Sequence, residues 1–245
     1  MLGNQGGLSI TTVEHLLAAI RGLKFDNVTI EVDGAEVPIM DGSSAAFVEA
    51  IDRVGICELN APKRFVKVLK TVRVRHGRSW GELRPHAGFY LDVEINYDCL
   101  AIGHQRRALE MTSDVFRADV SRARTFGFAK DVEVLWASGR AIGSSLENTI
   151  AIRDEQIVNP EGLRYSDEFV RHKMLDAVGD LALAGAPMLC AYHSSRGGHS
   201  LNHGVLKALF ADRTAWTTVE ASSVWHTNHV TGLRQLSPPA DAISS

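Results

Sequence analysis

The sequence has few cysteines: three in 245 residues, at Cys57, Cys99 and Cys190. They lie far apart, and none has the paired spacing of a zinc knuckle or a redox motif. We therefore expect no disulfide framework and three thiols buried among apolar residues, in a reducing compartment.

Long apolar runs and an excess of basic charge are also lacking. No stretch approaches membrane-spanning length, and Met1–Gly7 does not have the positive and apolar regions of a signal peptide. The formal net charge is -3 and the pI is near 6.4, which argues against a nucleic-acid partner. We expect a cytoplasmic monomer without stable membrane insertion.

The remaining composition is that of a folded globular protein, with 45% hydrophobic and 22% charged residues. Periodicity, caps and turn residues predict helices at residues 11–22, 44–55, 113–122, 167–184 and 199–210. The predicted strands are residues 27–32, 36–40, 65–75, 81–84, 89–97 and 187–192.

These elements predict an α+β fold of two small sheet-on-helix (two-layer) domains that face each other. Asn60-Ala61-Pro62 is typical of a linker, so we divide the chain into a first domain (1–60) and a second domain (61–215). The tail, residues 216–245, has no clear period, and we expect it to be loosely ordered.

The helix predicted at residues 167–184 carries His172, Asp176 and Asp180 on one face, because these residues are four apart. Val170, Met174, Val178 and Leu181 fall on the opposite, core-facing side. The polar stripe can simply face water. Phe169 and Leu183 lie on its side, however, which favours a covered stripe, and covered polar groups need partners.

A catalytic zinc takes three protein ligands and keeps a position for water. His172 and Asp176 offer two, and His15, beside the small residues Ala18 and Ala19, is the best third candidate. The neighbouring Glu14 could accept a proton from water. Alternatively, Glu14 forms a capping box with Thr11, and His15 is a satisfied core histidine. The spacing is not the HExxH of common zinc proteases, so this pattern alone is only suggestive.

Two further groups could serve hydrolysis of an amide. His199 follows Gly197-Gly198 at a helix start, where Asp180 could keep its ring cationic for protonating a leaving amine. Thr125, within Ser121–Phe128, could donate to an oxyanion. The alternatives are a surface histidine and a local capping threonine.

Five segments, taken together and in order, resemble the UDP-3-O-acyl-N-acetylglucosamine deacetylase family. They are Thr12–Ala18, Pro38–Ser43, Ser121–Phe128, Phe169–Asp176 and Gly198–Asn202. The similarity runs from about Ile10 to about Phe210. It implies a cytoplasmic zinc hydrolase of lipid A (lipopolysaccharide) synthesis, which removes acetate from the glucosamine nitrogen of an acylated UDP-sugar in the committing step.

The resemblance also implies a role for each matching residue. Zn²⁺ would be held by His15, His172 and Asp176, with Glu14 as base, His199 as acid or electrostatic group, Asp180 as its partner and Thr125 at the oxyanion. Substrate contacts would come from Lys173, Phe126 and Arg196, the last in place of a family lysine. The stretch from Phe128 to Ile152 resembles an inserted βαβ unit that forms an apolar acyl-chain passage.

One departure concerns the first domain. In the family, the motif around Glu14 and His15 follows a strand-rich half that this sequence does not contain, so the resemblance implies an N-terminally truncated first domain. Two alternatives to a hydrolase remain. One is a silent homologue that binds metal or nucleotide sugar without turnover, and the other is a nucleic-acid-binding α+β module, which the acidic pI disfavours.

Overall fold

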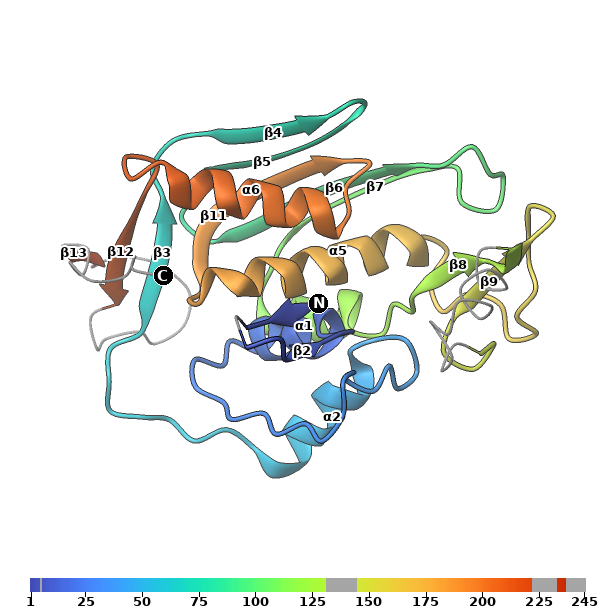
Figure 1. The fold of residues 1–245 in the computed structure, drawn as a ribbon, viewed down its shortest axis with the longest axis horizontal. Helices are drawn as coiled ribbons and strands as arrows, with labels where there is room; N and C mark the ends of the chain where they lie inside the picture. Colours follow the sequence, from blue (N-terminus) through green and yellow to red (C-terminus); the bar gives the residue numbers. More distant parts are fainter. Residues whose placement is uncertain (5, 131–144, 222–232, 237–245) are drawn as a thin grey trace.

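The structure is a computed structural model, and it describes residues 1–4, 6–130, 145–221 and 233–236. The fold is a mixed α+β arrangement, as the sequence predicts (Figure 1). Among the described helices, none combines the length and apolar character that crossing a lipid bilayer requires.

A mixed sheet with β11 (Met188–Ser195) at its centre is the largest feature of the fold (Figure 1). β11 pairs antiparallel with β5 and parallel with β6, while β4 and β7 pair with β5 and β6 in turn. The start of β11 pairs with β3, from which β12 and β13 extend the sheet. The bounds are β3 Arg64–Val68, β4 Val72–His76, β5 Ser79–Pro85, β6 Phe89–Asn96, β7 His104–Glu110, β12 Trp216–Ala221 and β13 Leu233–Leu236.

Helix α5 (Glu168–Leu181) lies between this sheet and helix α1 (Glu14–Gly22) (Figure 1). α6 (His199–Ala211) lies beside α5 and packs on β4 and β5. The remaining helical segments are α2 (Ala45–Val54), α3 (Ser113–Val115), the π-helical turn η1 (Phe116–Val120) and the 3-10 turn η2 (Ala182–Ala184). Every predicted helix is therefore present.

The two stripes of α5 are both buried. Val170, Met174 and Val178 on the predicted core face are fully buried, which confirms that prediction. The polar stripe of His172, Asp176 and Asp180 is only 2, 2 and 5% exposed. The alternative in which these groups face water is therefore wrong, because α1 and α6 cover them.

The crossing of α1 and α5 is unusually close at Gly179. A Cβ atom at this position would lie 2.1 Å from the carbonyl oxygen of Glu14, so only glycine fits there without a shift. The completely buried Ala18 and Ala19 provide small surfaces on α1. These residues set the distance between the helix that carries Glu14 and His15 and the helix that carries the polar stripe.

A small separate sheet lies at one end of α5 (Figure 1). β8 (Phe126–Phe128) pairs parallel with β9 (Ile150–Arg153), which pairs antiparallel with β10 (Gln156–Ile157). A parallel pair needs a crossover connection, and the inserted βαβ unit expected between Phe128 and Ile152 stays a prediction. Residues 131–144, which include Trp136 and Ile142 of that stretch, lie outside the described residues.

The prediction of strands at residues 27–32 and 36–40, in the expected first domain, is wrong, because the structure forms no strand at either place. Among the described residues, the strands of this part are β1 (Leu2–Gly3) and β2 (Ser9–Ile10), with one isolated bridge between Thr11 and Glu36. Val28, Ile30 and Val32 alternate as a strand would, but they are exposed. Alternation makes a strand only where a neighbouring strand and a core receive it.

The structure also differs from the prediction for other strands and for one cysteine. The expected loose order beyond Trp216 fails for β12, which pairs along β3. The predicted single strand at 65–75 is two strands, β3 and β4, and β7 was not predicted. Cys57 is exposed, whereas Cys99 and Cys190 are buried free thiols as expected. The domain division at residues 60–62 stays a prediction.

Candidate active site

Three predicted metal ligands from two helices meet in the interior. His15 of α1 and His172 and Asp176 of α5 offer ligand atoms that all lie within 4.8 Å of one another. The three residues are 4, 2 and 2% exposed. The i, i+4 spacing places His172 and Asp176 side by side, and the close helix crossing brings His15 to them.

The hydrogen bonds of this cluster leave ligand atoms free. Nδ1 of His172 donates to the carbonyl oxygen of Ala123 over 3.1 Å, so its Nε2 lone pair faces the cluster. Oδ2 of Asp176 accepts from Nζ of Lys173 over 2.9 Å. Oδ1 of Asp176 and Nδ1 of His15 are buried without a hydrogen-bond partner. Buried polar atoms without a partner are costly, and a cation bound between the three residues would satisfy Oδ1 of Asp176, which lies 4.0 Å from Nε2 of His15.

The protonation states suit a metal as well. Burial lowers the pKa of His172 to about 4, so its ring is neutral near pH 7. Burial also lowers the pKa of His15. For Asp176, burial opposes ionisation, but His172 and Lys173 outweigh it and hold the carboxyl pKa well below its usual range. Two neutral imidazoles and one carboxylate are a common donor set for zinc.

A second polar group lies beside the cluster, where α6 begins. Nδ1 of His199 donates to Oδ2 of Asp180 over 2.8 Å, and its Nε2 lies 3.8 Å from Oε1 of Glu14. Asp180 also accepts from Nδ2 of Asn202 over 2.7 Å. The hydrogen bond with Asp180 raises the pKa of His199 to about 9, so the ring is cationic at neutral pH.

Glu14 and His199 border a cavity of about 130 Å³, whose walls also include Asp180, Leu17 and Met1. Val13 caps α1 without a side-chain bond, so the capping box predicted between Thr11 and Glu14 is wrong. The hydroxyl of the neighbouring Thr12 donates a hydrogen bond to the carboxylate of Glu36. The Glu14 side chain is therefore not used as a helix cap.

Thr125 and Phe126 lie on the segment that passes the end of α5. The backbone of Thr125 donates to the Gly42 carbonyl over 2.7 Å and accepts from Ile150 over 2.8 Å, which fixes its place between the turn at Gly42 and the start of β9. The Phe126 ring centroid lies 6.1 Å from that of His172. Nζ of Lys173 lies 5.3 Å from the same phenyl ring. Phe126 and Lys173 are thus neighbours of the cluster.

Arg196 lies at the turn before α6, in the left-handed region with φ of 53°. Its backbone N–H donates to the Glu94 carbonyl over 2.9 Å, which ties the turn to the end of β6.

A buried ion pair between Arg124 and Glu168 was not predicted, although both residues lie in or beside segments that carried the resemblance. Their charge alone gave no signal of burial.

Comparison with known proteins identifies one family along most of the chain. The family model described as LpxC, UDP-3-O-acyl N-acetylglycosamine deacetylase, matches residues 1–211. UDP-3-O-acyl-N-acetylglucosamine deacetylases of Brucella ovis and Brucella canis are each 55% identical to the chain over 213 residues. The matched part covers 86% of this chain and 74% of each relative.

Proposed function

The chain belongs to the UDP-3-O-acyl N-acetylglycosamine deacetylase family, and from this premise we propose that it hydrolyses the N-acetyl group of an acylated UDP-glucosamine with Zn²⁺. The released product would be acetate, and the reaction would belong to lipid A synthesis in the cytoplasm, as the resemblance implies. The observation that carries the proposal is the buried cluster of His15, His172 and Asp176, whose ligand atoms lie within 4.8 Å of one another and in which Oδ1 of Asp176 has no hydrogen-bond partner.

Zinc held by these three residues would polarise the amide carbonyl and lower the pKa of a water molecule. Glu14 borders the adjoining cavity, and its carboxylate would take the proton of that water. His199 would protonate the leaving amine, since its hydrogen bond with Asp180 keeps the ring cationic. Thr125 would donate to the oxyanion.

Three residues are proposed for substrate binding. Lys173 and Arg196 would contact the phosphates with their positive charge, and the Phe126 ring would contact the substrate beside the metal. Lys173 already neutralises one oxygen of Asp176, so it would serve the metal site and the substrate together.

The test combines metal analysis with turnover of the acylated UDP-sugar. The purified chain should contain one zinc and release acetate, whereas Glu14→Gln should keep the zinc and lose about two to four orders of magnitude in rate, the range for a positioned proton-transfer group. Zinc without turnover in the unsubstituted chain would instead support the silent homologue that only binds metal or nucleotide sugar.

A further inference from the structure

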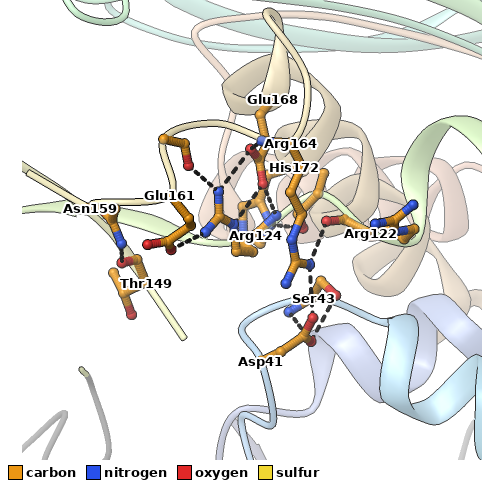
Figure 2. A network of polar contacts seen from close by, with 12 residues as sticks. Asp41, Ser43, Arg122, Arg124, Thr149, Asn159, Glu161, Arg164, Glu168 and His172 are labelled. Carbon is orange, nitrogen blue, oxygen red and sulfur yellow. Dashed lines mark hydrogen bonds and ion pairs between the residues drawn. The ribbon is translucent and has the colours of Figure 1, made fainter. Parts of the chain in front are cut away.

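A buried ion pair lies next to the metal cluster (Figure 2). Arg124 is 2% exposed and Glu168 is fully buried. Oε1 of Glu168 accepts from Nε and from the backbone N–H of Arg124, both over 3.0 Å, and Oε2 accepts from Nη2 over 3.2 Å. Burying two charges is costly and often stabilises less than apolar packing would, so the pair needs a reason beyond stability.

The pair joins the segment 123–125 to helix α5, next to the proposed metal ligand His172. Glu168 lies one helical turn before His172 on α5. Arg124 lies between Ala123, whose carbonyl accepts from Nδ1 of His172, and Thr125. We call Arg124 and Glu168 the clamp, because together they fasten the segment 123–125 to α5.

Further bonds fix the clamp itself (Figure 2). Nη1 of Arg124 donates to Glu161 and Nη2 donates to the Gly162 carbonyl, each over 2.7 Å. Oε2 of Glu168 also accepts the backbone N–H of Arg164 over 2.5 Å. Both carboxylate oxygens of Glu168 are therefore used, and the guanidinium of Arg124 cannot turn without losing several bonds.

We propose that Arg124 and Glu168 are positioning residues for the metal site. The clamp holds the Ala123 carbonyl at Nδ1 of His172, which fixes the ring as the Nδ1–H tautomer and directs the Nε2 lone pair into the cluster. The inference rests on the proposed function, because it assumes that a metal binds there. A pair with a merely structural role would change stability and leave the ring of His172 unaffected.

The first experiment measures the zinc dissociation constant by chelator competition, together with the thermal unfolding midpoint of the metal-free protein. Glu168→Gln keeps the shape of the side chain but replaces one acceptor oxygen by an NH₂ donor. Arg124→Lys keeps the positive charge but loses the planar guanidinium with its several N–H donors. Each should weaken zinc binding by about 10- to 100-fold, the usual effect of losing the partners that orient a ligand.

Leu209→Ala is the control, because it opens a cavity in the core at α6 without touching the clamp. It should lower the unfolding midpoint and leave zinc binding unchanged. The proposal is overturned if both clamp variants bind zinc within twofold of the unsubstituted chain, or if Leu209→Ala weakens zinc binding as much as they do.

A second measurement needs no clamp variant to fold. Nitrogen NMR of the metal-free, unsubstituted protein reports the tautomer of each histidine, and His172→Gln assigns the signal. We expect the Nδ1–H form for His172, and an Nε2–H form would overturn the proposal. This outcome is separate from failure of the proposed function, which would show as a chain that binds no zinc at all.

Discussion

At the scale of single residues, the chemistry of the site depends on Oδ1 of Asp176, which is buried without a hydrogen-bond partner. Leaving a buried carboxylate oxygen unpaired costs about 1–3 kcal/mol, so a fold that keeps Oδ1 of Asp176 4.0 Å from Nε2 of His15 is expected to bind a cation there. His172 completes the donor set, and its other nitrogen is already occupied by Ala123.

Replacing His172 tests this donor set directly. His172→Ala removes one of three proposed protein ligands, so zinc content after dialysis should fall from about one per chain to near zero, as elemental analysis would show. His193→Ala is the matched control, since His193 pairs with Asp92 on the sheet and should leave the zinc in place. Full zinc occupancy in His172→Ala would contradict the ligand assignment.

The pH dependence of turnover tests His199. Its pKa is raised to about 9 chiefly by Asp180, so the protonated form that donates a proton persists to that pH and is lost above it. In Asp180→Asn the pKa should fall toward the ordinary value. The alkaline limb of the kcat/KM profile should therefore move to lower pH by about one to two units. An unmoved limb would assign that limb to another group.

At the scale of elements, the crossing of α1 and α5 decides whether the ligands meet. Gly179 allows the two helices to touch at Glu14, and no side-chain bond caps the start of α1. Packing against α5 is therefore what holds His15 in place, since a helix of nine residues is not stable by itself.

Gly179→Ala should disturb this crossing. The new Cβ would lie 2.1 Å from the Glu14 carbonyl oxygen, so α1 must move, at a cost of roughly 1–3 kcal/mol and with weaker zinc binding. Gly204→Ala in α6 is the control, because its Cβ would lie 3.6 Å from Val74 and alanine favours the helix by up to about 1 kcal/mol. Chemical denaturation measures the free energy of unfolding of each variant, and zinc titration measures its zinc affinity. Equal losses in Gly179→Ala and Gly204→Ala would contradict the role of the helix crossing.

At the scale of the whole molecule, the proposed zinc joins α1 near the start of the chain to α5, more than 140 residues later. The metal is expected to bind only the folded arrangement. The unfolding midpoint of the chelator-treated protein should therefore be about 5–10 °C lower than that of the protein with zinc at about one hundred times the dissociation constant. Hydrogen exchange should rise across residues 14–22 at the same time. In His172→Ala, which lacks the site, a chelator should change neither quantity.

The sequence by itself determined the helices and the identity of the candidate site residues, because periodicity is a local property and the five family-like segments are continuous stretches of chain. Only the tertiary structure decided which strands exist. Residues 27–32 alternate but remain exposed, whereas the charged segment His104–Glu110 becomes β7 because β6 offers it hydrogen-bond partners. The tertiary structure also decided that the polar stripe of α5 is covered and that Arg124 and Glu168 are buried together. Burial depends on which segments from elsewhere in the chain pack against a residue.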